Sequence, residues 1–186
     1  MTATNERSFR IAPASRDDVA DLQALVRRLA EYERLGGICV STEADLTDAL
    51  FGPRPVAEAL IVRLDANPHL CIGFALFFHT YSTFLGRRSL WLEDLFVIPE
   101  YRGRGVGRAL LVELAALARA RDCGRFEWAV LDWNASAIRF YESLGATVLP
   151  DWRIARVTGE SLARLAEKTP SPEAAPTPER VRRNRE

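Results

Sequence analysis

A glycine-rich segment that carries two arginines is the part of the chain best suited to bind an anion. It lies between an apolar run that ends at Val97 and an apolar helical run that continues to about Arg121. Glycine adopts positive φ angles and admits a ligand close to the backbone, and the first N–H groups of a helix have no partner within the helix. The sequence therefore predicts a phosphate-binding turn made of Arg102, Gly103, Arg104, Gly105, Val106 and Gly107.

The spacing of these glycines excludes two nucleotide-binding motifs. The pattern is G-x-G-x-G, so the third glycine comes one residue earlier than in the dinucleotide-binding fingerprint. A Gly-Lys-Ser/Thr sequence does not follow, so the segment is not a Walker loop. A glycine turn with a purely structural role remains the alternative, and the neighbouring segments are needed to decide.

Two adjacent acids, Glu93 and Asp94, interrupt the apolar run just before the turn. A carboxylate inside a β-sheet core costs free energy unless it has a partner, so both acids need an explanation. Because successive side chains of a strand point to opposite faces, we expect the two acids to have different roles. An ion pair between Glu93 and one of the many arginines is the structural alternative to a role in chemistry.

A second candidate segment lies about forty residues further on and is predicted to be a helix over residues 134–145. Asn134 is a favourable N-cap residue and Gly145 a favourable helix stop. Phe140 and Tyr141 lie inside this helix. Tyr141 offers a phenol for proton transfer, although a buried tyrosine with a hydrogen-bonded hydroxyl would explain it equally well.

In this order, the acidic strand, the R-x-x-G-x-G turn and the N-x-x-A-x-x-F-Y helix resemble the GNAT superfamily of acetyl-CoA-dependent N-acetyltransferases. The similarity is greatest to the branch of spermidine/spermine (diamine) and thialysine N-acetyltransferases, and it covers roughly residues 9–166. It is carried by Leu-Ala-Glu-Tyr-Glu at 29–33, Trp-Leu-Glu-Asp-Leu-Phe-Val at 91–97, Tyr-Arg-Gly at 101–103, Asp-Trp-Asn at 132–134 and Phe-Tyr at 140–141.

The resemblance implies an α/β (α+β) fold of known layout. Its central twisted sheet is mixed but mostly antiparallel, has six to seven strands and is flanked by helices. One parallel pair of strands splays apart and forms the slot for acetyl-CoA. The resemblance also implies a homodimer, because the active site of these relatives lies at a dimer interface.

The resemblance also assigns roles to individual residues. A lysine-like ammonium has a pKa of about 10.4 and must lose a proton before it attacks, so a base is needed; Glu93 is expected to be that base. Tyr141 is expected to protonate the departing thiolate of CoA. The turn and Arg108 would hold the diphosphate, and Asn134 would contact the pantetheine arm, cap its helix, or do both. The acetyl group would meet the backbone of Leu95, Phe96 and Val97, and the cofactor would also contact Tyr141.

Tyr32 and Glu33 match the family's pair of amine-contacting residues, and with Glu93 and Asp94 they are the expected substrate-binding residues. The chain departs from the diamine acetyltransferases after a Thr-Tyr pair at 80–81, where they have Asp-Pro-Trp and this chain has Ser-Thr-Phe. The missing acid weakens the case for long polyamines. A diamine or a lysine-like amino acid such as thialysine stays open.

Two other functions remain as alternatives, namely a GNAT enzyme that acetylates a protein amine and a non-catalytic acyl-CoA-binding module. A covalent acetyl-cysteine route is disfavoured because Cys123 follows a helix and Cys39 and Cys71 have no neighbouring histidine. Direct attack of the amine in a ternary complex is therefore expected.

Composition predicts one globular domain at residues 8–167, followed by a Pro/Arg-rich, disordered tail at 168–186. The 186-residue chain is 48% hydrophobic and 27% charged with a formal net charge of zero, so nothing draws it to nucleic acid or to a membrane surface. It has neither an apolar run of about 18 residues nor a signal-peptide core, which favours the cytoplasm. His69 and His79 lack ligand-like spacing, so no metal is expected.

Periodicity and turn residues predict the elements that position these groups. The expected strands span residues 9–11, 57–64, 70–78, 89–98, 125–131 and 153–157. The expected helices start near residues 15, 42, 106, 134 and 161.

Overall fold

The computed structural model describes residues 8–167, so the predicted tail at 168–186 lies outside the described residues. The chain divides into two compact units, Met1–Trp133 and Asn134–Glu186. No helix in the described range is long and apolar enough to cross a membrane.

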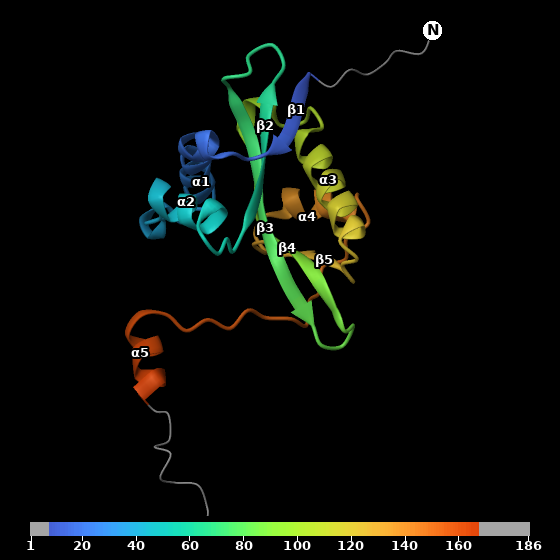
Figure 1. Ribbon diagram of the computed structural model, residues 1–186. Coiled ribbons are helices and arrows are strands. Elements are labelled where there is room, and N and C mark those ends of the chain that lie inside the picture. The colour runs from blue at the N-terminus through green and yellow to red at the C-terminus, as the bar shows by residue number, and fades with distance from the viewer. Residues whose placement is uncertain (1–7, 168–186) are drawn as a thin grey trace, which may run out of the picture. The chain divides into compact units, whose positions relative to one another are not determined.

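The first unit is built on one mixed sheet of five strands in the order β1-β2-β3-β4-β5 (Figure 1). Neighbouring strands are antiparallel except for β4 and β5, which are parallel. The strands are β1 (Phe9–Pro13), β2 (Glu58–Leu64), β3 (Cys71–Ser82), β4 (Arg87–Val97) and β5 (Phe126–Trp128).

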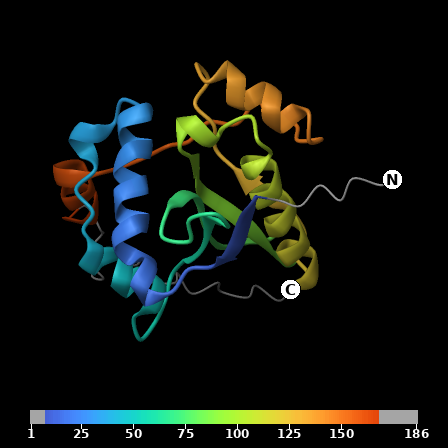
Figure 2. The ribbon, with the colours of Figure 1, turned by 90° about the horizontal axis from the view of Figure 1, so that it is seen from above.

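Helices cover both faces of this sheet: α1 and α2 lie on one face and α3 on the other (Figures 1 and 2). The helical elements of the first unit are η1 (Arg16–Asp18), α1 (Val19–Tyr32), η2 (Gly36–Ile38), α2 (Glu43–Phe51), η3 (Pro99–Tyr101) and α3 (Val106–Ala120). The core lies between these layers, because apolar side chains of the strands and of both helix layers are removed from water there. The largest fully buried side chains are Phe74, Phe77, Leu22, Ile72, Leu90, Leu110, Leu114, Val62 and Val106.

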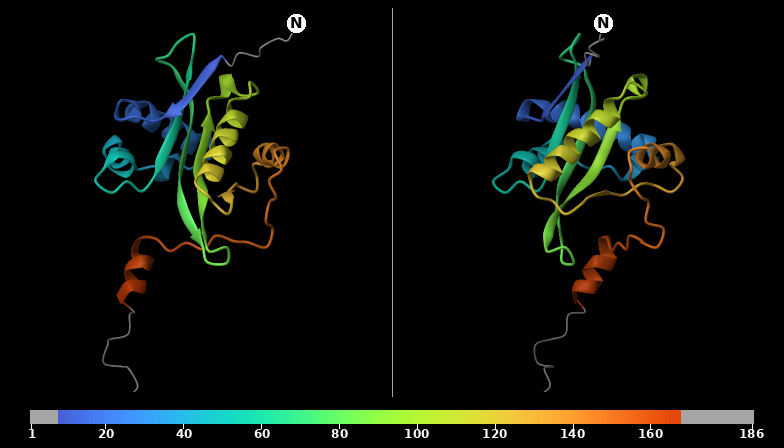
Figure 3. Two further views of the ribbon diagram at one scale, coloured as in Figure 1. Left: turned by 45° about the vertical axis from the view of Figure 1, so that its right-hand side comes forward. Right: turned by 90° about the vertical axis from the view of Figure 1, so that its right-hand side faces the viewer.

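The structure corrects the predicted sheet in three places, one of which is β5, which spans Phe126–Trp128 rather than residues 125–131. The sheet has five strands rather than six to seven, and the expected strand at residues 153–157 does not form; within residues 134–167 the structure contains helices but no strand. Strand β3 is longer than predicted, because residues 79–82 continue to pair with residues 87–90 of β4 (Figure 3). The predicted strand ended at residue 78, but backbone pairing along the hairpin keeps residues 79–82 in the strand.

The second unit contains α4 (Ala135–Glu142) and α5 (Gly159–Glu167) in its described part. Asn134 is the N-cap of α4 as predicted, and its side-chain oxygen accepts a hydrogen bond from the N–H of Ala137 at 3.2 Å. Gly145 follows α4 with a φ of 91°, a left-handed conformation that suits a glycine helix stop.

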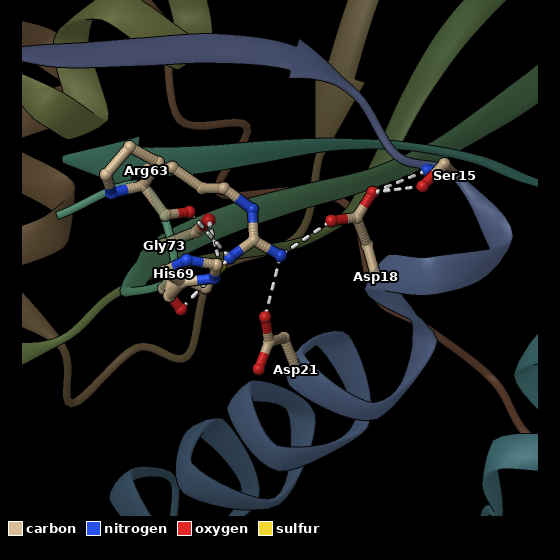
Figure 4. A network of polar contacts seen from close by, with 8 residues as sticks. Ser15, Asp18, Asp21, Arg63, His69 and Gly73 are labelled. Atoms are coloured by element: carbon tan, nitrogen blue, oxygen red, sulfur yellow. Dashed lines mark hydrogen bonds and ion pairs between the residues drawn. The ribbon is translucent and has the colours of Figure 1, made fainter. Parts of the chain in front are cut away.

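A partly buried cluster of ion pairs ties the start of α1 to β2 (Figure 4). Arg63 donates hydrogen bonds to Asp18 at 2.6 Å and to Asp21 at 2.7 Å, and Asp18 in turn accepts from the N–H and the hydroxyl of Ser15. Burial raises the pKa of Asp18, but the hydrogen bonds from Arg63 and Ser15 outweigh it and lower the pKa below its usual value. The cluster thus fixes the direction in which α1 leaves the sheet.

Replacing Arg63 by methionine should lower the free energy of unfolding by about 1–3 kcal/mol, because Asp18 is then left largely buried without its cation. Urea denaturation of the full chain measures this. The matched control is Arg10→Met, whose ion pair with Asp65 is exposed and 3.7 Å long, and which should cost less than about 0.5 kcal/mol. Equal losses for both variants would contradict a special role for the Arg63 cluster.

Candidate active site

The site is centred on an irregularity in β4. Leu76 of β3 lies opposite Asp94 and Phe77 lies opposite Leu92, so Glu93 has no residue facing it. This is a β-bulge, in which an extra residue on one strand locally changes the twist and re-aims the neighbouring side chains. The two acids found in the sequence therefore lie at the one point where β4 departs from regular pairing with β3.

Beyond the bulge, one backbone edge of β4 has no strand beside it in the described sheet. Pairing with β5 ends at Leu92 and Trp128, although β4 continues to Val97. Ile98 donates its N–H to the carbonyl of Ile72 on the β3 side. Since the direction of backbone groups alternates along an antiparallel strand, the N–H groups of Leu95 and Val97 point away from β3, toward the open edge.

This geometry agrees with the predicted parallel pair, because β4 and β5 are parallel and pair only as far as Leu92. Two backbone N–H groups at the open edge could meet a carbonyl oxygen that gains negative charge in a reaction. Phe96, between them, is buried and 3% exposed, and holds the edge in place. A cofactor contact at Leu95, Phe96 and Val97 stays a prediction.

The two acids have different surroundings. Glu93 is exposed, and its carboxylate accepts a hydrogen bond from the indole N–H of Trp91 at 2.9 Å, which orients it. Asp94 instead lines a cavity of about 110 Å³ together with Glu33 at the end of α1. The rest of the cavity wall is mainly apolar and includes Val26, Leu29, Leu35 and Ile38.

The carboxyl groups in this region disfavour one another's ionisation. Burial, together with the negative charges of Glu93 and Glu33, raises the pKa of Asp94 to about 6. Burial also raises the pKa of Glu33. A cation placed in the cavity would relieve both effects, because an opposite charge favours the ionised form.

The predicted anion-binding turn has the required backbone. Gly103 has a φ of 74° and Gly105 a φ of 81°, values that side chains with a Cβ rarely adopt. Gly105 is the N-cap of α3, and the first backbone hydrogen bond of that helix runs from Ala109 to Gly105. No side chain caps α3, so the N–H groups of its first turn, at Val106, Gly107 and Arg108, are left without a capping partner and could bind an anion.

Two arginines of the turn have different surroundings. The guanidinium of Arg104 lies 4.9 Å from the ring centroid of Tyr101. Arg102 donates from Nε to the carbonyl of Val97 at 2.9 Å, and its guanidinium lies over the ring of Tyr32. Tyr32 therefore contacts the cofactor turn, whereas its neighbour Glu33 faces the cavity.

Two predicted site residues belong to the second unit and are described there. Asn134 caps α4 through its side-chain oxygen, which confirms one of its two predicted roles. Tyr141 lies on α4, and its ring is 5.4 Å from that of Phe140, centroid to centroid. In the part of the chain that the structure describes, no group of three His, Cys, Asp or Glu side chains could hold a metal ion.

Comparison with known proteins identifies the family. A model of the acetyltransferase (GNAT) family matches residues 23–146. The chain is 36% identical to thialysine N-epsilon-acetyltransferase of Mus musculus, over 86% of this chain and 98% of that protein. It is 32% identical to L-ornithine N5-acetyltransferase NATA1 of Arabidopsis thaliana, over 87% of this chain and 90% of that protein. Among solved structures, an integron cassette protein of V. cholerae superposes with a TM-score of 0.71 at 26% identity, covering 86% of this chain and 98% of that one.

The chain therefore belongs to the GNAT acetyltransferase family. It is an acetyl-CoA-dependent N-acetyltransferase with the GNAT fold. The sequence missed the bulge at Glu93 and the cavity wall at Leu35 and Ile38. The Gly-Gly pair at 36–37 signalled only a break after α1, and nothing local signalled that the following residues return to line a site.

Asp94→Asn should remove a pH dependence of stability. The folded-state pKa of Asp94, about 6, is above its unfolded value, so its contribution is fully favourable below about pH 4 and is lost as the pH rises through 6. At pH 7.5 the variant should gain up to about 2–3 kcal/mol in the free energy of unfolding, measured with urea from pH 4 to 8. The exposed Glu113→Gln on α3 is the control. An Asp94→Asn profile parallel to that of the wild type would contradict the assignment.

Gly105→Val should abolish tight binding of acetyl-CoA, because valine resists a φ of 81° and the turn must rearrange. We expect the dissociation constant, measured by calorimetry, to rise at least about tenfold. Gly86→Val is the matched control: Gly86 also has a positive φ, 63°, and open space around its Cβ position, but it lies in the β3–β4 turn. Binding should fail only in the first variant; equal affinities would show that the glycine turn does not hold the cofactor.

Proposed function

We propose that this enzyme transfers the acetyl group of acetyl-CoA to a primary amine of a small cationic molecule. The substrate class is a short diamine or a lysine-like amino acid such as thialysine or ornithine. The amine attacks directly in a ternary complex. The observation that carries the proposal is the cavity in which Glu33 and Asp94 face an apolar wall, next to the open edge of β4.

The cavity suits an ammonium on an alkyl stem. Its apolar side chains would take the stem out of water, and the carboxylates would pair with the charge. At about 110 Å³ the space matches a short aliphatic chain better than an extended polyamine or a folded protein surface. Tyr32, the neighbour of Glu33 at the end of α1, adds an aromatic ring, and aromatic faces attract cations.

The β3–β4 hairpin supports a short substrate. At the position where diamine acetyltransferases have an acid, this chain has Ser82, which is buried and 3% exposed. Its hydroxyl accepts a hydrogen bond from the N–H of Leu85 at 3.3 Å and so serves the turn. A distant second amine would find no carboxylate at this position.

The names of the relatives support the same class. Proteins called thialysine and L-ornithine acetyltransferases are 31–36% identical to this chain over at least 85% of its length. Both named substrates are small amino acids that carry a side-chain amine. A spermidine/spermine acetyltransferase-like protein of Homo sapiens is 31% identical, so polyamines remain in the panel of substrates to be tested.

Different residues of the chain have different roles in the proposed reaction. Glu93 takes the proton from the ammonium, directly or through water, while Glu33 and Asp94 hold the cation. The N–H groups of Leu95 and Val97 donate to the acetyl oxygen as it gains charge. The backbone of the turn and Arg108 hold the diphosphate of the cofactor.

Tyr141 completes the cycle by donating its phenolic proton to the sulfur that leaves. This role comes from the family resemblance, since Tyr141 follows Phe140 on α4 as the catalytic tyrosine does in the family. Asn134 caps α4 with its oxygen, so a contact with the pantetheine arm would use its amide nitrogen. A homodimer is likewise expected from the family resemblance.

The function is tested by turnover of a panel that contains thialysine, ornithine, lysine, putrescine, spermidine and a lysine peptide, followed as released thiol. We expect the small amino acids or the diamine to have the highest kcat/KM. Highest activity on the peptide would overturn the substrate class.

Tyr141→Phe should lower kcat about 100-fold or more with little change in acetyl-CoA affinity, because a positioned acid contributes about that factor. An unchanged kcat would overturn the role of Tyr141.

A further inference from the structure

Arg102 is the first residue of the cofactor turn, yet two of its donors are used within the chain. Its backbone N–H bonds to the carbonyl of Pro99 at 3.1 Å, and its Nε donates to the carbonyl of Val97 at 2.9 Å. The Val97 carbonyl belongs to the open edge of β4, on the same side as the N–H groups of Leu95 and Val97. Arg102 therefore reaches back to the acetyl-binding edge rather than out over the turn.

The remaining part of the side chain packs between two aromatic rings. The guanidinium carbon of Arg102 lies 4.5 Å from the ring centroid of Tyr32 and 5.5 Å from that of Phe96. Both distances are within the range of a cation–π interaction. Tyr32 is the last residue of α1, and Phe96 lies between Leu95 and Val97 on β4. The side chain of Arg102 thus contacts both Tyr32, next to the proposed amine-binding Glu33, and Phe96 on the proposed acetyl-binding edge of β4.

We propose that Arg102 is a positioning residue that fixes the end of α1, and with it Glu33, relative to the open edge of β4. The inference rests on the proposed function, because it concerns how the amine is placed against the acetyl group. Small displacements matter here, since reacting atoms must approach to about 3–3.5 Å with the correct alignment. Arg102 acts on the amine through Tyr32 and touches neither reacting atom.

Arg104, in the same turn, is a matched control for the positioning role of Arg102. Arg104 is two residues further on and also stacks on an aromatic ring, that of Tyr101 at 4.9 Å, but Tyr101 belongs to η3 and not to the amine side. Removal of the charge at Arg104 should weaken acetyl-CoA binding alone. Removal at Arg102 should affect the use of the amine.

The test combines kinetics at saturating acetyl-CoA with calorimetry of acetyl-CoA binding, using the best amine of the panel. Arg102→Met should lower kcat/KM for the amine about tenfold and change the acetyl-CoA dissociation constant less than about threefold. Arg102→Lys, which keeps a cation, should recover much of the loss. In a Tyr32→Leu background, Arg102→Met should cost less than about threefold more, whereas in Tyr32→Phe, which keeps the ring, the tenfold loss should persist.

The result for Arg104→Met should be the reverse, with weaker acetyl-CoA binding and an unchanged kcat/KM for the amine at saturating cofactor. The inference is overturned if Arg102→Met behaves like Arg104→Met, or if the losses from Arg102→Met and Tyr32→Leu multiply in the double variant. Thermal melting of each variant identifies any that fail to fold, and the lysine variant then carries the comparison.

A second measurement separates this inference from the proposed function. Amide hydrogen exchange over residues 29–33 reports the end of α1 without any substrate, and it should be faster in Arg102→Met than in the wild type or in Arg104→Met. A wild-type enzyme that acetylates no small amine would refute the proposed function. Unchanged exchange over residues 29–33 would refute the positioning role, whatever the substrate.

Discussion

The site depends on β4 extending beyond the end of its parallel neighbour β5. Pairing of β4 with β5 ends at Leu92, and β4 continues to Val97 with the N–H groups of Leu95 and Val97 directed to the open edge. Unpaired backbone donors at a sheet edge are costly to bury and ready to bind an acceptor. The chain places the glycine turn directly after this edge and the acids directly before it.

The cavity lined by Glu33 and Asp94 carries an electrostatic cost in the folded state. Asp94 is largely buried, near Glu33 and Glu93, and its pKa is raised to about 6 by burial and by these charges. An apolar side chain at this position would avoid the cost of desolvation. A cation in the cavity would favour the ionised carboxylate, so the cost of burying Asp94 is consistent with the proposed amine site.

Local patterns predicted the parts of the site that depend on short-range rules. The glycines at 103 and 105, the start of α3 and the cap at Asn134 follow from backbone conformation and helix ends, and the structure confirms their placement. The bulge at Glu93 and the packing of Arg102 on Tyr32 depend on register and on contacts between distant segments. Neither leaves a local signal in the sequence.

The errors in the strand assignments have the same origin. The β-like residues at 153–157 form no strand in the described structure, because a strand requires a paired neighbour and not only a suitable composition. Conversely, residues 79–82 lie beyond the predicted end of β3 but pair along the hairpin. Family resemblance supplied the sheet type, including the parallel pair of β4 and β5, while its strand count was too high.

Residue-resolved amide hydrogen exchange with and without acetyl-CoA tests the central feature directly. The N–H groups of Leu95 and Val97 face the open edge, whereas those of Asp94 and Phe96 face β3. Acetyl-CoA should slow exchange at Leu95 and Val97 by more than about tenfold and leave the already slow Asp94 and Phe96 nearly unchanged. Uniform slowing of all four residues, or no change at Leu95 and Val97, would contradict an acetyl-binding edge on β4.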